Sequence, residues 1–194
     1  MNQMLQETEL SQLETSQPQV PDGAGAPEAS EPPPLEHPRF IRPQRVAFVQ
    51  AAWHREVVEE CRIAFLQEIE ARHITNVDLF EVPGSFEIPL HAQLLAKTRR
   101  YSAIVAAGLV VDGGIYRHEF VADTVIKALM DVQLRTEVPV FSAVLTPQQF
   151  HESAVHVEFF RKHFVIKGIE VAEACASTLH SLERLRGQVA AGIV

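Results

Sequence analysis

Basic residues are absent from the first 38 positions of this 194-residue chain, so all 17 of its lysines and arginines lie further along. The same segment holds seven acidic residues, seven of the twelve prolines and no Phe, Trp or Tyr. A segment so poor in apolar side chains cannot bury enough surface to form a core. We therefore expect residues 1–40 to be a disordered acidic tail and residues 41–194 to form one globular domain.

Cysteines and long apolar runs are also scarce. The two cysteines, Cys61 and Cys175, lie far apart in stretches of helical periodicity, where a cysteine is usually a small buried hydrophobic residue. The sequence has no run of about 18 apolar residues and no signal-peptide pattern, which argues against a membrane span and against secretion. We expect a cytoplasmic protein without a membrane partner.

Positive charge is not concentrated anywhere in the remainder of the chain. Residues 39–194 hold 17 basic and 18 acidic residues, with no basic block. Binding to nucleic acid depends mainly on such a block, which neutralises the phosphates. The sequence therefore predicts no nucleic-acid partner.

Short apolar runs alternate with amphipathic stretches from Arg45 onwards, a pattern typical of a parallel sheet covered by helices on both faces. The predicted strands are residues 45–51, 76–82, 103–111 and 138–145. Apolar residues at helical spacing predict helices between Val57 and Ile69 and over residues 85–97, 117–135, 149–163 and 169–188. Ser85 is a possible cap of the second helix. The expected fold class is α/β, a three-layer α/β/α sandwich whose four-stranded parallel sheet has the flavodoxin-like order 2-1-3-4.

Ligands of such sheets bind beyond the carboxyl ends of the strands, so the turns that follow the predicted strands should hold the functional residues. The first turn contains the only tryptophan, Trp53, which can stack on a planar heterocycle or pack beneath a loop. Gly113-Gly114 before a helix can bring backbone N–H groups to an anion, although a plain turn fits equally well. Arg117 can pair with phosphate or be a solvated surface residue.

Nine histidines raise the question of a metal site. His151 and His156 are five residues apart, so they do not share a helix face as the histidines of zinc proteases do. We expect no metal. The sequence also lacks a nucleophile elbow, a Walker loop and a Gly-x-Gly-x-x-Gly fingerprint, so neither a hydrolase nor an NAD-dependent enzyme is supported.

Taken in order, the turns resemble those of the lumazine synthase family. An aromatic residue follows the first strand, VPGSFEIP the second and VVDGGIYRHEFV the third, and Lys167-Gly168 precedes the predicted last helix. The resemblance covers about residues 44–190. It implies condensation of 5-amino-6-(D-ribitylamino)uracil with L-3,4-dihydroxy-2-butanone 4-phosphate to give 6,7-dimethyl-8-ribityllumazine, phosphate and water, without a metal or organic cofactor.

The resemblance also implies which residues bind the substrates. Trp53 stands where the family stacks an aromatic ring on the pyrimidine. The ribityl chain and the ring edge are held at the positions of Ser85, Phe86 and Glu87. The backbone lines the uracil pocket at the positions of Leu109, Val110 and Val111. The phosphate-facing turn corresponds to Gly114 and Ile115.

Three positions depart from the family pattern. The histidine that the family uses as a proton carrier is replaced by Arg117, and His118 follows it. Arginine stays protonated near neutral pH, so the catalytic assignment of Arg117 is positional and favours stabilisation of the phosphate or of a developing oxyanion. A second aromatic position falls on Ser142. The phosphate-binding arginine falls on His156, or on Arg161 if a gap in the alignment lies earlier.

These departures resemble a tryptophan-containing subgroup that assembles as a decamer of two pentamers, with each active site between neighbouring subunits. We therefore expect a pentamer-based homo-oligomer. Two alternatives are a flavin- or lumazine-binding assembly with weak or no catalysis, and a carrier scaffold that displays the tail.

Overall fold

The structure is a computed structural model that describes residues 37–114, 117–151 and 153–194. Most of the predicted tail, residues 1–36, and the predicted site residue Ile115 therefore lie outside the described residues. The elements follow one another as β1 (Arg45–Ala51), α1 (Arg55–Ala71), β2 (Asn76–Val82), the 3₁₀ turn η1 (Ser85–Glu87), α2 (Ile88–Lys97), β3 (Ala103–Leu109), α3 (His118–Thr136), β4 (Val140–Leu145) and α4 (Ala154–Ala190).

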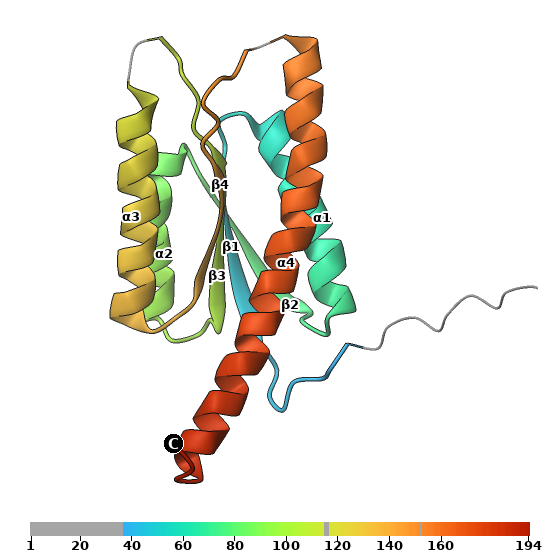
Figure 1. Cartoon of the computed structure of the whole chain (residues 1–194), viewed down its shortest axis with the longest axis vertical. Helices are drawn as coiled ribbons and strands as arrows, with labels where there is room; N and C mark the ends of the chain where they lie inside the picture. The colour runs from blue at the N-terminus through green and yellow to red at the C-terminus, as the bar shows by residue number, and fades with distance from the viewer. Residues whose placement is uncertain (1–36, 115–116, 152) are drawn as a thin grey trace, which may run out of the picture. The chain divides into compact units, whose positions relative to one another are not determined.

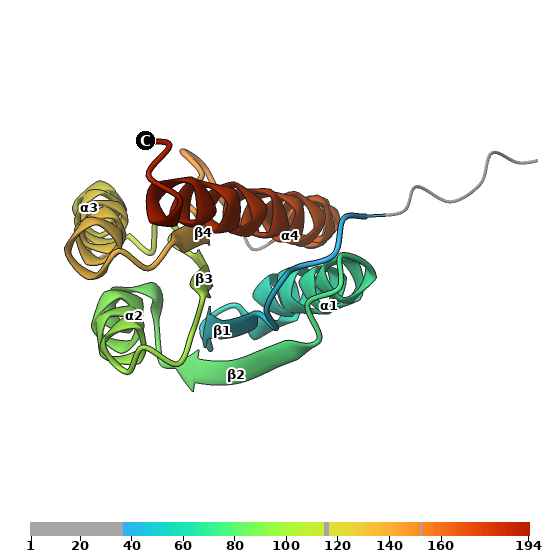
Figure 2. The same ribbon diagram turned by 90° about the horizontal axis from the view of Figure 1, so that it is seen from below.

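All strand pairs are parallel and the sheet order is β2-β1-β3-β4, which confirms the predicted topology. Helices α1 and α4 cover one face of the sheet, and α2 and α3 cover the other (Figures 1 and 2). Because β1 and β3 are central and covered on both sides, nearly every residue in them is buried, as their unbroken apolar runs require.

The two faces of β1 belong to two separate hydrophobic layers. Val46 and Phe48 pack with α1 and α4, whereas Ala47 and Val49 pack with α2 and α3. Each fully buried Val or Phe contributes about 1.5–3 kcal/mol relative to exposure. The alternation fixes the register of β1, because a shift by one residue would exchange the two layers.

The predicted division of the last helical region is wrong. The two helices expected at residues 149–163 and 169–188 form a single helix, α4, which begins at Ala154 and runs to Ala190. Lys167-Gly168 does not end the helix; Gly168 instead allows α4 to pack closely on α1. A Cβ on Gly168 would lie 2.5 Å from the carbonyl oxygen of Cys61 and 2.8 Å from Cβ of Ala64. Close contact between α1 and α4 offsets the roughly 1 kcal/mol that a mid-helix glycine costs.

Other differences are local. Strand β3 ends at Leu109 and not at Val111, and β4 begins at Val140 and not at residue 138. Ser85 does not cap the second helix; the Glu87 carboxylate instead accepts the N–H of Gly84 at 2.9 Å and closes η1. Both cysteines are buried as expected, and burial raises the pKa of each thiol to about 12.

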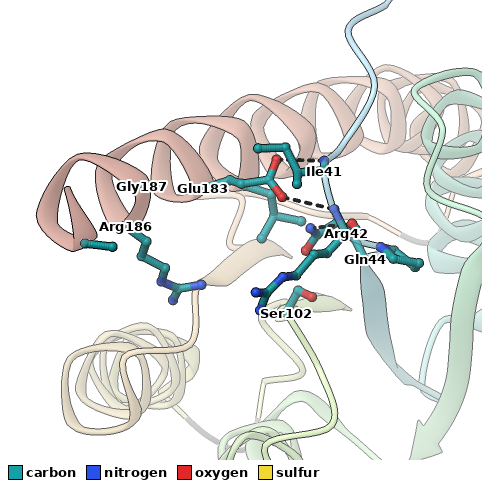
Figure 3. A pocket seen from close by; sticks show the side chains of 10 residues that line it. Ile41, Arg42, Gln44, Ser102, Glu183, Arg186 and Gly187 are labelled. Atoms are coloured by element: carbon teal, nitrogen blue, oxygen red, sulfur yellow. Dashed lines mark hydrogen bonds between the residues drawn. The ribbon is translucent and has the colours of Figure 1, made fainter.

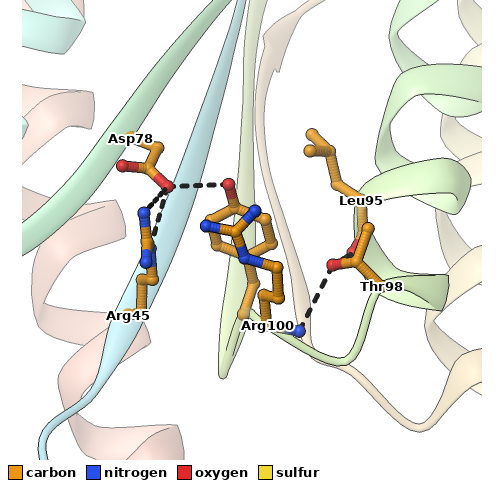
Figure 4. A network of polar contacts seen from close by, with 6 residues as sticks. Arg45, Asp78, Leu95, Thr98 and Arg100 are labelled. Atoms are coloured by element: carbon orange, nitrogen blue, oxygen red, sulfur yellow. Dashed lines mark hydrogen bonds and ion pairs between the residues drawn. The ribbon is translucent and has the colours of Figure 1, made fainter.

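A polar network holds the amino ends of three strands together (Figure 4). The Asp78 carboxylate accepts hydrogen bonds from the Tyr101 hydroxyl at 2.7 Å and from Arg45 Nε at 2.8 Å. The Tyr101 hydrogen bond, followed by Arg45, holds the pKa of Asp78 below its usual value. Burial and the neighbouring carboxylate raise the pKa of Tyr101.

The residues just before β1 lie against the carboxyl-terminal part of α4. Phe40 stacks on His180 with ring centroids 3.7 Å apart, and the Glu183 carboxylate accepts the N–H groups of Ile41 and Arg42 at 3.2 and 3.3 Å. A cavity of about 430 Å³ lies beside this contact (Figure 3). None of the predicted site residues lines it.

Candidate active site

A second cavity, of about 310 Å³, lies at the carboxyl ends of the central strands and is lined mainly by apolar side chains. Six of the predicted site residues line it: Trp53, Ser85, Phe86, Leu109, Val110 and Val111. They come from the segments after β1 and β2 and from the end of β3, three parallel strands whose carboxyl ends meet at one edge of the sheet. The fold therefore brings together the ring-binding positions that the sequence predicts.

Trp53 is held at the end of β1 by the backbone. The N–H groups of Ala52 and Trp53 donate to the carbonyls of Val82 and Pro83 at 2.7 and 3.1 Å, which extends the pairing of β1 with β2 past the sheet. His54 then takes a left-handed conformation, φ 55°, and turns the chain into α1. The indole remains 67% exposed, so this large aromatic ring is available to another molecule.

Gly84 supports the indole from the neighbouring turn. A Cβ at this position would lie 2.9 Å from Cε3 and 3.0 Å from Cζ3 of Trp53, closer than carbon atoms approach. The Glu87 carboxylate fixes the Gly84 backbone through its hydrogen bond. Glu87 itself does not line the cavity, so its position is that of a support for the turn.

Ser85 also lines the cavity. Its side chain is buried and its Oγ has no hydrogen-bond partner among the described residues. A Cβ on Gly108 of β3 would lie 2.4 Å from this Oγ, so the glycine leaves the space that the hydroxyl occupies. An unpaired buried hydroxyl costs about 1–3 kcal/mol, which a bound polar group would recover. Phe86, 60% exposed, forms part of the rim.

Two predicted residues between β3 and α3, Gly114 and Arg117, do not line this cavity in the single chain. The N–H of Gly114 donates to Asp112 Oδ1 at 2.8 Å, so within the described residues it is already engaged. Gly114 lines a separate cavity of about 320 Å³, together with residues of the β4–α4 loop such as Gln149 and His151. Arg117 is exposed, and its guanidinium lies 4.6 Å from the ring centre of Phe120, outside the Trp53 cavity.

Ser142, His156 and Arg161 do not line this cavity in the single chain. Ser142 lies on the edge strand β4, where its Oγ accepts the N–H of Val144 at 3.3 Å. His156 faces His151 with ring centroids 5.1 Å apart, and its Nδ1 is buried without a partner among the described residues. The guanidinium of Arg161 is paired with Glu60 of α1, with Nε 3.1 Å from the carboxylate.

Four lining residues were not among the predicted ones: His54, Gly113, His118 and Val121. His54 could have been found as the residue directly after Trp53. His118 and Val121 lie on the first turn of α3, and only the direction of that helix brings both to the cavity.

Comparisons with known proteins identify the family of the chain. The sequence model described as 6,7-dimethyl-8-ribityllumazine synthase matches residues 43–183. The chain is 84% identical over 163 residues to "6,7-dimethyl-8-ribityllumazine synthase 2" of Bradyrhizobium diazoefficiens, which spans 84% of this chain and 99% of that protein. The chain belongs to the 6,7-dimethyl-8-ribityllumazine synthase family.

Within the lumazine synthase family, the degree of similarity differs between relatives. A second protein named "synthase 2", from Rhodopseudomonas palustris, is 66% identical over 172 residues, which is 87% of this chain and 94% of that protein. A protein named "synthase 1", from Caulobacter vibrioides, is 34% identical over 146 residues, 74% of this chain and 94% of that protein. The matched region of the family, residues 43–183, contains every residue that lines the Trp53 cavity.

Two further findings concern the described part of the chain only. None of its helices is both long and apolar enough to cross a membrane. It also contains no group of three or more His, Cys, Asp or Glu side chains placed to hold a metal ion.

Proposed function

We propose that the chain catalyses the condensation of 5-amino-6-(D-ribitylamino)uracil with L-3,4-dihydroxy-2-butanone 4-phosphate to form 6,7-dimethyl-8-ribityllumazine in riboflavin biosynthesis. The observation that carries the proposal is the exposed Trp53 ring, which packs against Gly84. The ring lines an apolar cavity at the carboxyl ends of the strands. An apolar slot with one aromatic wall fits a flat pyrimidine. The names and identities of the relatives support the same reaction.

The residues divide into a ring-binding and a phosphate-binding part. Trp53 stacks on the pyrimidine, while Ser85, Phe86 and the backbone of residues 109–111 surround the ring and the ribityl chain. Glu87 holds the Gly84–Ser85 turn. From the family resemblance we assign Gly114, Ile115 and Arg117 to the phosphate-binding part; Ile115 lies outside the described residues.

Orientation supplies most of the rate enhancement in this proposal. Holding two reactants in line can contribute about 7–11 kcal/mol, because the entropy of bringing them together is lost on binding and not in the reaction step. The amine of the pyrimidine attacks the ketone and phosphate leaves without help from a metal or organic cofactor. Arg117, always protonated, stabilises the phosphate or a developing oxyanion.

We also propose a homo-oligomer built from pentamers, with a decamer as the assembly of the tryptophan-containing subgroup. Ser142 and His156 lie away from the cavity of their own chain, so they would serve as site residues only for a neighbouring subunit. Large apolar side chains are exposed on three helices, which an interface would cover: Leu90 and Leu94 on α2, Met130 and Leu134 on α3, and Phe159 and Ile166 on α4.

Two free cysteines suit a reducing compartment, which supports the proposed cytoplasmic location. Neither the described residues nor the names of the relatives favour the non-catalytic scaffold that the sequence left open.

The decisive test is an assay of the purified full chain with both substrates, in which the absorbance of the lumazine product is followed. We expect turnover well above the uncatalysed condensation. A rate equal to the uncatalysed one would reject the proposal. Light scattering on the same sample gives the mass of the assembly and tests the oligomer separately.

A further inference from the structure

We infer that His118, and not Arg117, is the side chain that transfers protons in the proposed condensation. The inference rests on the proposed function and assigns a residue that the alignment with the family pattern does not. His118 lines the cavity that contains Trp53 and Leu109, whereas Arg117 does not.

The geometry directs Arg117 away from the ring-binding residues. Arg117 precedes α3 as its N-cap residue, with φ −74° and ψ 93°, and its guanidinium lies over the exposed ring of Phe120 at 4.6 Å. A guanidinium also remains protonated near neutral pH. Its place and its chemistry both suit a fixed positive charge.

His118 is the first residue of α3, and its side chain is 13% exposed. The start of the helix places it on the cavity wall together with Val121, one turn further along α3. Its Nδ1 lies 3.7 Å from a carboxylate oxygen of Glu119, an ion-pair distance when the imidazole is protonated. An imidazole is the side chain that can accept and release a proton near neutral pH.

Other titratable groups surround His118. His54 lines the same cavity from the turn after β1, with its Nδ1 4.0 Å from Glu56. Glu119 and Arg117 flank His118 in the chain, and Asp112 is engaged by the N–H of Gly114. Among the described residues, His54 is thus the one competing imidazole on the cavity wall, and the test must separate the two.

The first step of the reaction, in which the amine and the ketone form a C=N bond, requires protons to move from the nitrogen to the oxygen. The amine nitrogen forms a bond to the ketone carbon as the carbon–oxygen π bond breaks, and the oxygen takes a proton. The oxygen then takes a second proton as the remaining carbon–oxygen bond breaks and leaves as water, while the nitrogen lone pair forms the C=N bond and the nitrogen releases its last proton. Both protons lost by the amine are balanced by the two that the oxygen gains, so one group that gives a proton to the oxygen and takes one from the nitrogen suffices if it acts once in each half of the step.

The test compares His118→Gln, His54→Gln and Arg117→Lys with the wild-type chain, and uses His180→Gln, at the opposite end of the sheet, as the matched control. We expect His118→Gln to lower kcat about 10²-fold, the lower end of the range for general acid–base catalysis. The step of the pH–rate profile near neutrality should disappear in this variant alone. Arg117→Lys should be slower but keep the step, and His180→Gln should match the wild type.

Two further measurements exclude a merely structural role. Titration of Trp53 fluorescence with 6,7-dimethyl-8-ribityllumazine should show unchanged affinity in His118→Gln, and added imidazole should restore activity to His118→Ala. The inference is overturned if His118→Gln keeps the wild-type pH profile, or if His54→Gln is the variant that loses it. Absence of turnover in the wild type is a different result, because it rejects the proposed function and this inference with it.

Discussion

Gly84→Ala is the sharpest perturbation of the ring-binding site. The new Cβ would lie 2.9 Å from Cε3 of Trp53 and 3.2 Å from Oε2 of Glu87. Carbon atoms prefer separations of about 3.5–4.0 Å, so the indole must retreat by roughly 0.6 Å or more. The backbone permits alanine, because Gly84 has φ −139° and ψ 178°, an extended conformation open to any residue. The substitution therefore acts mainly on the ring and displaces the Glu87 carboxylate by a smaller amount.

The expected magnitude follows from the stacking energy. Stacking of a base on an aromatic side chain is worth about 1–3 kcal/mol, and a displaced indole should lose a large part of it. We expect about tenfold weaker binding of the pyrimidine substrate, which corresponds to about 1.4 kcal/mol. The free energy of unfolding should change little, because the ring is 67% exposed and can move into solvent.

The only tryptophan of the chain makes the assay direct. Tryptophan emission, excited selectively over that of the two tyrosines, reports on Trp53 alone. Its maximum should shift in Gly84→Ala, while KM for the pyrimidine rises more than kcat falls. Gly187→Ala is the matched control, since a Cβ there meets no atom within 4 Å.

A double-mutant cycle with Trp53→Phe supplies the refutation. Phenylalanine lacks the second ring that carries Cε3 and Cζ3, so Gly84→Ala should cost less in that background. Equal penalties in both backgrounds, or unchanged fluorescence and KM in the single variant, would show that Gly84 does not set the position of the ring.

Further predictions concern other parts of the molecule. Trp53→Ala should weaken binding of the pyrimidine by about 1–3 kcal/mol, measured by calorimetry because the variant has no tryptophan fluorescence. Unchanged affinity would show that the ring does not stack on the pyrimidine. Gly168→Ala should destabilise the chain by about 1–3 kcal/mol in urea unfolding, because its Cβ would overlap the backbone of α1. The depressed pKa of Asp78 contributes stability above the pKa of an unfolded Asp, about 3.9, which is lost as the pH falls through the lower folded value. Asp78→Asn should therefore flatten the fall in unfolding free energy on acidification, by no more than about 1 kcal/mol since the pair is partly exposed. Thiol reagents at neutral pH should leave Cys61 unmodified until the chain unfolds, because burial raises its pKa to about 12; rapid modification of the native chain would contradict this.

The sequence alone determined the sheet and the ring-binding half of the site. Unbroken apolar runs identify β1 and β3 because strands covered on both faces have no solvent side, and the alternation of strands with helices predicts that the sheet is parallel. Trp53 could be predicted because ligands of such sheets bind where the strands end, and Ser85 because the resemblance to the family assigns it to substrate binding.

Only the tertiary structure decided the remainder, because it depends on contacts between segments distant in the sequence. Gly168 looks like a helix break until Cys61 and Ala64 of α1 are seen to lie against it. Arg117 and His118 are adjacent in the chain, yet the start of α3 directs only His118 to the cavity. Ser142 lies on the edge strand β4 and does not line the cavity of its own chain, which only the arrangement of the strands reveals.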